Sequence, residues 1–288
     1  MSNRPTKLCV LAEPYLRDFE IQSIETAVEE INVEIPLVLV NEVGQSGIDP
    51  ELKANVVNNK VSLDALRLFI KLLEVHGAWT FVFAEKTITE QLGVGEHPIV
   101  HEDVNEISCF SEAVIRHVTP IRDGNWMELP PEAVDLVREN CDIVVRYGFG
   151  LLRGEILRAT EYGVLSFHPA DIRQYRGLGV PKAWLDGKDV MGMTLQRLSE
   201  EIDGGEIVAY QETDVSDCAT LWEVYEELRL LQTELLAEGI RNLADPTVEI
   251  TTPESLGPYY PTTSRRTLSF AGRTLSKNMV GRVKNRIG

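Results

Sequence analysis

The sequence predicts an α/β protein with a mostly parallel sheet flanked by helices. The first observation is a strand, a helix and a second strand in succession, at Lys7–Ala12, Phe19–Ile31 and Val33–Val40. This order favours parallel strands joined by a crossover helix. The second observation is a later helix, Pro130–Asn140, that leads directly into the apolar strand Asp142–Tyr147. Together these alternating strands and helices indicate an α/β domain.

The first half of the chain is less regular after its opening. In Phe19–Ile31 the apolar residues recur at helical spacing. The polar segment Asn41–Lys60 is predicted to be a connector, and Ser62 is predicted to cap a helix from Leu63 to about Val75. The apolar face of that helix would consist of Leu66, Phe69, Leu72 and Leu73. We predict a further strand at Trp79–Phe83.

The second half contains the most structured stretch of the chain, from Gly163 to Val208. The apolar strand Gly163–Phe167 ends on His168, and Pro169 stops its hydrogen-bonding ladder. Further elements follow in order: a helical turn at Pro181–Gly187, a turn at Ile202–Gly205, a strand at Glu206–Tyr210 and a long helix at Ala219–Leu243. Leucines repeat at helical intervals along the long helix, so we expect it to pack against the sheet.

Two ionisable residues of this stretch, His168 and Asp203, lie at strand-to-loop transitions. Ligands of open parallel sheets bind in the crevice outside the carboxyl ends of the strands. A histidine there can exchange a proton near neutral pH, and a neighbouring carboxylate can fix its tautomer and favour its charged form. The alternative is a buried histidine without a catalytic role and an aspartate that only terminates a turn.

The charge of the chain is strongly negative, with 45 acidic and 28 basic residues and a net charge of −17. Seven of the basic residues lie in a tail from Arg265 onward that contains no Asp or Glu, so the body carries 21 basic against 45 acidic residues. Such a body repels polyanions, so a nucleic-acid partner is disfavoured unless the tail recruits it. The acidity also suggests a cytoplasm of high salt concentration. The tail itself could be disordered.

Several functional classes lack support in the sequence. No apolar run approaches 18 residues, the N-terminus has no long apolar signal segment, and no Gly-x-Gly-x-x-Gly follows the first strand. The four cysteines, Cys9, Cys109, Cys141 and Cys218, show no metal-binding spacing, and no metal site is predicted. Reduced thiols in a cytoplasmic protein are the simplest account.

The stretch resembles the family of formyltransferases that use 10-formyltetrahydrofolate, which includes methionyl-tRNA, glycinamide ribonucleotide and nucleotide-sugar formyltransferases. The family pattern is Asn-x-His, a loop reaching Arg-Gly, then Pro and Trp, then Gly-x-Thr, and Asp-x-Gly before a strand. The chain has these elements in the same order, at His168, Arg176-Gly177, Pro181, Trp184, Gly192-Met193-Thr194 and Asp203-Gly204-Gly205. Upstream, Cys141–Leu152 resembles the family strand that ends in Tyr-Gly and a cofactor-binding loop.

The resemblance covers about Glu132 to Ala237 and implies a Rossmann-like formyltransferase fold for residues 1–244, followed by a C-terminal extension, 245–288. It implies an enzyme of the hydroxymethyl- and formyltransferase class, with His168, Asp203 and Ser166 as catalytic residues. It implies a folate site made of Tyr147, Gly148, Phe149, Gly150, Leu151, Leu152, Leu198, Ser199, Glu200, Glu201, Ile202 and Gly204. Arg176 and Gly177 would bind the acceptor, although Arg176 could equally form a structural salt bridge.

One departure from the family pattern concerns the asparagine two residues before the histidine, which is Ser166 here. In the family this amide helps to hold the formyl oxygen as it becomes an oxyanion, and loss of one such donor typically costs about 100- to 1,000-fold in rate. Because residues two apart on a strand share a face, Ser166 is expected to point into the same cleft as His168. Gly150 and Leu152 also depart from the usual cofactor loop.

The predicted reaction transfers a formyl group to a primary amine of a small acceptor, such as an amino sugar nucleotide. Two alternatives remain: a hydrolase that releases formate, and a non-catalytic folate-binding regulatory protein. The segment between Lys86 and Arg116 matches no family pattern and could be an insertion that shapes the acceptor site. We leave open a homodimer.

Overall fold

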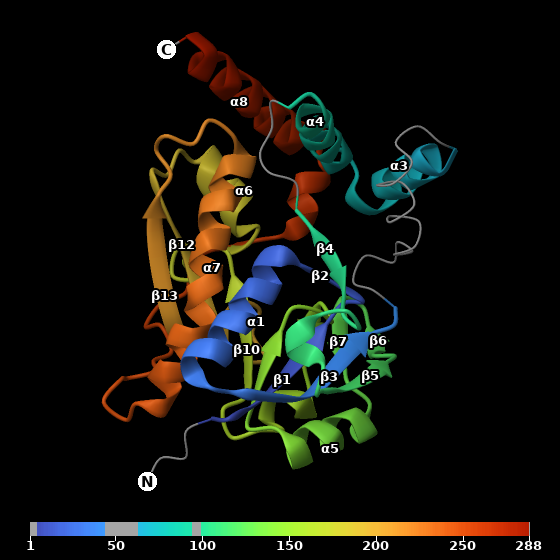
Figure 1. The fold of residues 1–288 in the computed structure, drawn as a ribbon. Coiled ribbons are helices and arrows are strands. Elements are labelled where there is room, and N and C mark those ends of the chain that lie inside the picture. The colour runs from blue at the N-terminus through green and yellow to red at the C-terminus, as the bar shows by residue number, and fades with distance from the viewer. Residues whose placement is uncertain (1–4, 44–62, 94–98, 288) are drawn as a thin grey trace.

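The computed structural model describes residues 5–43, 63–93 and 99–287. Its centre is a seven-stranded sheet in the order β13-β12-β10-β8-β1-β3-β5 (Figure 1). The strands are β13 (Glu206–Asp214), β12 (Val190–Arg197), β10 (Val164–His168), β8 (Ile143–Arg146), β1 (Lys7–Ala12), β3 (Glu34–Asn41) and β5 (Val114–Val118). Neighbouring strands are parallel except at β12, which is antiparallel to both β10 and β13. The predicted α/β fold with a mostly parallel sheet is confirmed.

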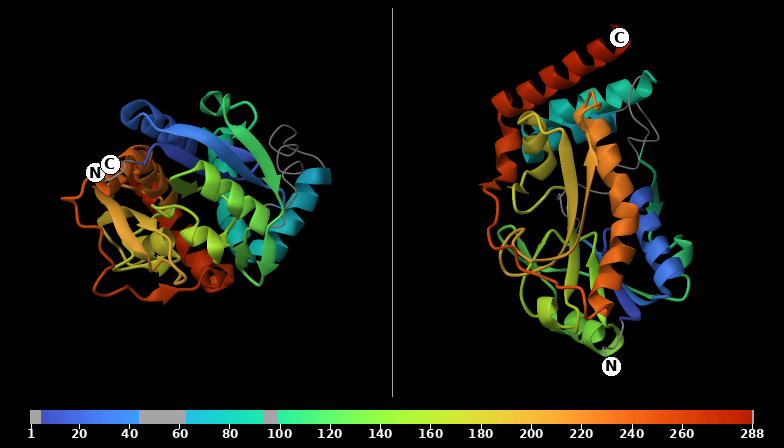
Figure 2. Two further views of the ribbon diagram at one scale, coloured as in Figure 1. Left: turned by 90° about the horizontal axis from the view of Figure 1, so that it is seen from below. Right: turned by 90° about the vertical axis from the view of Figure 1, so that its left-hand side faces the viewer.

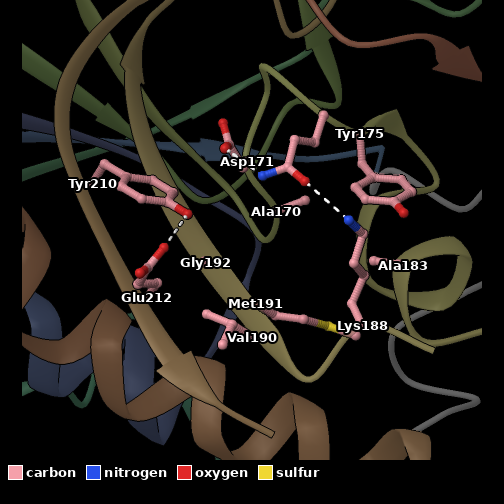
Figure 3. A pocket seen from close by; sticks show the side chains of 11 residues that line it. Ala170, Asp171, Tyr175, Ala183, Lys188, Val190, Met191, Gly192, Tyr210 and Glu212 are labelled. Carbon is pink, nitrogen blue, oxygen red and sulfur yellow. Dashed lines mark hydrogen bonds between the residues drawn. The ribbon is translucent and has the colours of Figure 1, made fainter. Parts of the chain in front are cut away.

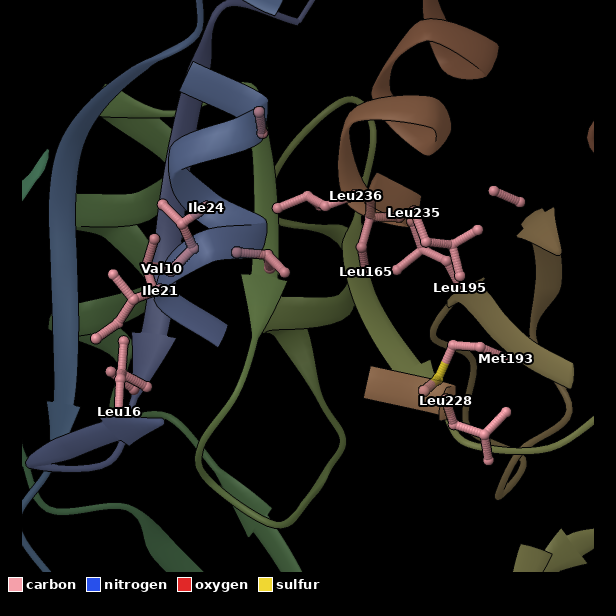
Figure 4. Packing of buried hydrophobic residues seen from close by; sticks show 14 of the residues in the cluster. Val10, Leu16, Ile21, Ile24, Leu165, Met193, Leu195, Leu228, Leu235 and Leu236 are labelled. Atoms are coloured by element: carbon pink, nitrogen blue, oxygen red, sulfur yellow. The ribbon is translucent and has the colours of Figure 1, made fainter. Parts of the chain in front are cut away.

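The sheet is buried on both faces. The helices α1 (Asp18–Ile31) and α7 (Leu221–Ala244) lie side by side on one face, where their apolar residues pack against the strands (Figure 4). The helix α5 (Pro131–Asn140) covers part of the other face (Figure 1). In β1, Leu8 and Val10 belong to the first core cluster, whereas Cys9 and Leu11 belong to the second. This alternation explains why the central strands read as nearly continuous apolar runs.

The predicted boundaries of the flanking helices agree with the structure to within two residues. Helix α1 ends at Ile31, and the next residue, Asn32, has a left-handed backbone (φ 58°) and donates its N–H to the Val28 carbonyl. Pro131 is the first residue of α5, where its missing N–H removes no helical hydrogen bond. Helix α7 begins after Thr220, whose hydroxyl accepts a hydrogen bond from the Glu223 N–H.

One predicted strand is wrong. Trp79–Phe83 forms the start of the helix α4 (Trp79–Gln91), which follows the helix α3 (Leu63–His76). Trp79 and Val82 are buried, and Trp79 lies against Phe83 and Phe270, so packing at i, i+3 and i+4 overrides the strand composition. Leu66, predicted for the buried face of α3, is 57% exposed. The predicted cap Ser62 and most of the predicted connector lie outside the described residues.

The basic tail is a helix, α8 (Leu268–Ile287), and the predicted alternative of disorder is wrong. It lies against α4 and α6 (Gly179–Leu185), at the end of the molecule far from the N-terminus (Figure 2). The Arg282 guanidinium donates to the Glu85 carboxylate, and the Lys277 ammonium donates to the Trp184 carbonyl. These contacts with α4 and α6 hold the tail in a defined position. The composition of the tail alone does not indicate them.

The remaining strands are short and form small sheets at the edges of the main one. They are β2 (Tyr15–Arg17) with β4 (His101–Asp103), β6 (Ile121–Asp123) with β7 (Trp126–Glu128) and β9 (Leu151–Leu152), and β11 (Arg176–Gly177) with β14 (Tyr259–Tyr260). The single turns of 3-10 helix are Ser108–Phe110, Glu155–Arg158 and Thr262–Arg266. Among the described helices, none combines the length and apolar character needed to cross a bilayer.

Candidate active site

The structure brings His168 and Asp203 together at the carboxyl edge of the sheet. His168 is the last residue of β10, and Asp203 lies in the loop between β12 and β13. The imidazole Nδ1 is 3.3 Å from the carboxylate Oδ1. His168 is 5% exposed and the Asp203 side chain is 18% exposed, so water screens the pair poorly.

The backbone conformation of Asp203 and its neighbours orients its carboxylate toward His168 and the Gly177 N–H. Asp203 has φ 48°, in the left-handed region that few side chains other than Asn and Asp adopt. Its Oδ2 accepts a hydrogen bond from the Gly177 N–H at 2.8 Å, and its Oδ1 lies 3.4 Å from the Gln196 amide nitrogen. At Gly177 (φ 74°) a Cβ would be only 2.1 Å from the Tyr260 carbonyl oxygen, so glycine is needed there.

Both ring nitrogens of His168 face oxygen acceptors. Nε2 is 2.9 Å from the Tyr175 carbonyl oxygen, and Nδ1 faces Asp203. A carbonyl oxygen can only accept, so Nε2 carries a proton. Each ring nitrogen of His168 therefore has an oxygen atom within 3.3 Å.

The electrostatics of Asp203 agree with this arrangement. Burial alone would raise the pKa of its carboxyl group. The hydrogen bond and charge of His168, the Gly177 N–H and the charge of Arg146 outweigh burial and hold that pKa below its usual value. Asp203 is thus kept ionised beside the imidazole.

Arg146 is a site residue that our sequence analysis missed. It ends β8 and is the register partner of Ser166 on β10. Its Nε and Nη2 atoms lie 3.1 and 2.7 Å from the Ser166 hydroxyl oxygen, and its Nη1 donates to the Gly150 carbonyl. Burial lowers the pKa of Arg146, and the charge of Asp203 opposes that shift. A lone arginine at the end of the buried run Ile143–Val145 was the available signal.

Ser166 differs in one respect from the prediction. It shares a sheet face with His168, as expected from alternation along β10. However, Ser166 is only 1% exposed, and the half-buried Arg146 bonds to its hydroxyl. Arg146 is therefore the more exposed of the two residues at this position.

The predicted folate loop after β8 is largely packed into the protein. Phe149 and Leu152 belong to the second core cluster, at 0% and 3% exposure. The Tyr147 hydroxyl bonds to the Ser23 hydroxyl of α1, its ring stacks on Phe167, and burial raises its pKa. These three side chains hold the loop in place. The loop contributes the Gly150 carbonyl to the site, where it accepts a hydrogen bond from Arg146.

The second predicted folate loop, between β12 and β13, borders a cavity of about 550 Å³. Leu198, Ser199 and Gly204 line it, whereas none of the residues of the first loop do. Glu200 lies on the surface 3.9 Å from Arg158, and Glu201 pairs with Arg176. The first loop thus binds Arg146 through Gly150 and the second loop contains Asp203, but only the second borders this cavity.

The contacts of Arg176 favour a structural role. Its guanidinium donates to the Gly257 carbonyl at 2.8 Å, to the Glu201 carboxylate at 2.6 Å and to the Ile202 carbonyl at 3.3 Å. These bonds fasten the Asp203 loop to the segment that leads into β14. Gly177, the neighbouring predicted acceptor residue, uses its N–H to hold Asp203.

A second cavity, of about 320 Å³, lies beyond Tyr175, whose carbonyl holds His168 (Figure 3). Its polar residues bond to one another: Lys188 lies 3.3 Å from the Gln174 side-chain oxygen, and the Tyr210 hydroxyl lies 3.1 Å from the Glu212 carboxylate. The cavity adjoins the site through the 170–175 loop, and His168 is not among its lining residues.

A comparison with protein families identifies the segment that carries this geometry. Residues 116–240 match the family model described as formyl transferase. Both His168 and Asp203 lie inside the matched range, as do Arg146 and Ser166. This part of the chain is therefore similar to the formyl transferase family. The match concerns formyl transfer and gives no support to hydroxymethyl transfer, the other part of the predicted class.

Curated relatives of this segment include methionyl-tRNA formyltransferases. The one from Rickettsia canadensis is 23% identical over 175 residues, which are 60% of this chain and 55% of the relative. The one from Acetivibrio thermocellus is 30% identical over 136 residues, which are 46% of this chain and 43% of the relative. The chain thus spans about half the length of the curated relatives it matches.

Solved structures of formyl transferases share the fold across most of the chain. A sugar N-formyltransferase from a Shewanella species superposes with a TM-score of 0.53 and 13% identity, covering 90% of this chain and 78% of that one. An N-formyltransferase from Helicobacter canadensis, in complex with folinic acid and dTDP-3-aminofucose, gives a TM-score of 0.52 and 12% identity, covering 95% and 80%. At these identities the likeness shows the fold alone.

Proposed function

We propose that this protein transfers a formyl group from 10-formyltetrahydrofolate to a primary amine of a small acceptor. The observation that carries the proposal is the His168–Asp203 pair, 3.3 Å apart and screened from water, inside the segment that matches the formyl transferase family. The low pKa of Asp203 supports a permanent carboxylate beside the imidazole. An ion pair that can donate and recover protons is what this reaction needs.

The reaction requires two proton movements. The amine nitrogen attacks the formyl carbon and forms the new C–N bond, while the formyl oxygen becomes an oxyanion. The amine then loses one proton, N10 of the folate gains one, and the C–N10 bond breaks to leave tetrahydrofolate and the formylated amine. In our proposal His168 moves these protons, and Asp203 stabilises its charged form.

His168 must change partners to do so. Both of its nitrogens are occupied, Nδ1 by Asp203 and Nε2 by the Tyr175 carbonyl. We infer that Nε2 exchanges the carbonyl for the substrate while Nδ1 keeps its contact with Asp203. A neutral carbonyl is the weaker of the two acceptors, since hydrogen bonds to ionised groups are roughly twice as strong.

The acceptor is proposed to be small and to carry an amine, such as an amino sugar nucleotide. The net charge of −17 argues against a polyanion such as tRNA, which is the substrate named for the curated relatives. The Helicobacter protein with a similar fold binds an amino sugar nucleotide, which supports that class here. A cytoplasmic location, where reduced folates are available, and a possible homodimer belong to the same proposal.

The donor site is proposed to lie between the two loops, at 147–152 and 198–204. The Gly150 carbonyl of the first loop accepts a hydrogen bond from Arg146, and the second loop contains Asp203. Since Tyr147, Phe149 and Leu152 are taken up by the core, we assign recognition of the pterin mainly to backbone groups and to the 198–204 loop, which already borders a cavity.

The test begins with 5-formyltetrahydrofolate, which resembles the donor and does not transfer its formyl group. Calorimetry should show saturable binding, and no heat and no thermal stabilisation at millimolar ligand would contradict the proposal. Incubation with 10-formyltetrahydrofolate and a panel of amino sugars and amino sugar nucleotides should then yield a formylated amine. Formate release without any acceptor would instead indicate a hydrolase, and binding without turnover would indicate a regulatory protein.

A further inference from the structure

Ser166, the residue that departs from the family pattern, does not stand alone in the structure. Its hydroxyl is bound by the guanidinium of Arg146. We propose that Arg146 is the group that binds the formyl oxygen, and that Ser166 is the positioning residue that anchors it. The inference rests on the proposed function and deepens it by assigning the oxyanion donor. It replaces the expectation, drawn from the sequence, that the serine hydroxyl takes over from the family's amide.

The exposure of the two side chains decides between them. Ser166 is 1% exposed, and its hydroxyl oxygen is held by Nε and Nη2 of Arg146. Arg146 is only half-buried. Arg146 is thus the more exposed residue of the pair, and the serine hydroxyl is already engaged by its guanidinium.

Arg146 has donors left for a ligand. A guanidinium carries five N–H groups. Within the described residues two of them point to Ser166 and one points to the Gly150 carbonyl. One N–H on each terminal nitrogen remains, and two such donors can converge on a single oxygen. The anchors at Ser166 and Gly150 fix the plane of the group, so little order has to be gained on binding.

The surrounding charges suit a donor to an oxyanion. Asp203 is near enough to Arg146 for each to shift the other's pKa, and Asp203 itself contacts His168. The Asp203 carboxylate thus lies between the Arg146 guanidinium and the His168 imidazole. Negative charge that develops on a formyl oxygen beside Arg146 would be stabilised by a full positive charge, which is a stronger partner than a neutral amide.

The serine has a size that this arrangement requires. Ser166 and Arg146 face each other across the β10–β8 register, with 2.7 Å between Oγ and Nη2. An asparagine would place its terminal atoms about 1.2 Å beyond the position of Oγ, in the space of the guanidinium. Asparagine at 166 and a bound Arg146 therefore exclude each other. Ser166→Asn is expected to lower turnover, although the family pattern by itself predicts an increase.

The kinetic test is a double-mutant cycle between the two positions. Arg146→Met should lower kcat by about 100- to 1,000-fold, the usual effect of losing one oxyanion donor, with the KM for the folate within threefold. Arg146→Lys should retain part of the activity. Ser166→Ala should cost about tenfold in the wild-type background, because it only loosens the arginine, and should cost nothing further when Arg146 is already Met.

A matched control uses another largely covered arginine. The Arg282 side chain is 16% exposed and bonds to Glu85 on α4. Arg282→Met should lower the melting temperature without changing kcat. Melting curves of the Arg146 variants then separate loss of folding from loss of the donor. If Ser166→Ala costs its full factor in both backgrounds and Arg146→Met costs less than threefold, Ser166 is the donor and the inference is wrong.

A binding test gives the same discrimination without turnover. The probe is a folate analogue with carbon in place of N10 and an aldehyde on that carbon, whose hydrate resembles the tetrahedral intermediate. The wild-type protein should bind it at least 100-fold more tightly than 5-formyltetrahydrofolate, and Arg146→Met should lose this preference. An unchanged preference in Arg146→Met overturns the inference and leaves the proposed function standing. Failure of the wild-type protein to bind either folate overturns both.

Discussion

Replacing Asp203 by asparagine removes the negative charge at the candidate site and keeps nearly the same side-chain shape. The carboxylate accepts a hydrogen bond from the Gly177 N–H at 2.8 Å and faces Nδ1 of His168 at 3.3 Å. An asparagine oxygen can still accept from Gly177, so the loop is expected to keep its course. Its NH2 group then faces Nδ1, which must become an acceptor. With Nε2 still donating to the Tyr175 carbonyl, the ring is held as the neutral tautomer.

The expected magnitudes follow from these contacts. The variant loses a charge-assisted hydrogen bond, which is worth about 1.5–3 kcal/mol of unfolding free energy. For a chain of this size that corresponds to a fall of a few degrees in melting temperature. Because general acid–base catalysis contributes about 100- to 10,000-fold, formyl transfer should fall by a factor in that range. Binding of 5-formyltetrahydrofolate should change little. His168→Ala should abolish transfer as well.

The assay is formyl transfer to a cognate amine, followed by the appearance of tetrahydrofolate. Asp214→Asn is the matched control, since Asp214 is exposed and caps a turn by accepting from the Ser216 N–H at 2.8 Å. That variant should keep full turnover. If Asp203→Asn retained turnover within threefold of the wild-type protein, the pair would not be part of the reaction, and the reasoning from its geometry would be refuted.

Three further predictions concern stability. Asn278→Ala should cost about 2–4 kcal/mol in urea unfolding, because the buried amide bonds to the Leu221 N–H and to Glu85; an effect no larger than that of the exposed Asn105→Ala would contradict this. The folded pKa of Asp203 is depressed, so its stabilisation is present above the unfolded pKa of about 3.9 and is lost as the pH falls through the folded value. The stability gap between the wild-type protein and Asp203→Asn should therefore shrink below about pH 4, and a constant gap from pH 6 to pH 3 would argue against this linkage. The melting temperature should rise from dilute buffer to molar KCl as repulsion in the acidic body is screened, and a flat or falling curve would remove the argument for a saline cytoplasm.

The central strands and the helices α1, α5 and α7 could be predicted because their signals are local. Such signals include the spacing of apolar residues, a proline in the first turn of a helix, and a glycine or asparagine just after its last turn. Each of them can be recognised within about twelve residues of sequence. The helix α4 could not be predicted in this way. Its first residues, Trp79–Phe83, have a composition typical of strands, and their contacts with Trp222 on α7 and Phe270 on α8 come from segments far away in the chain.

By itself the sequence determined the α/β fold and the candidate pair His168 and Asp203. His168 ends the parallel strand β10, at the edge of the sheet where ligands are expected to bind, and Asp203 lies in the turn before β13. How the two meet was decided by the structure: β12 is antiparallel to β10 and ends at Arg197, beside Leu165, so the loop that carries Asp203 returns toward His168. The tertiary structure decided that Arg146 covers Ser166 and that the tail forms the helix α8. Both results depend on partners brought together across the sheet or across the molecule: the β8–β10 register for the first, and Glu85 and Trp184 for the second. Contacts between residues distant in sequence arise only when the sheet and its helices have assembled, so no local pattern encodes them.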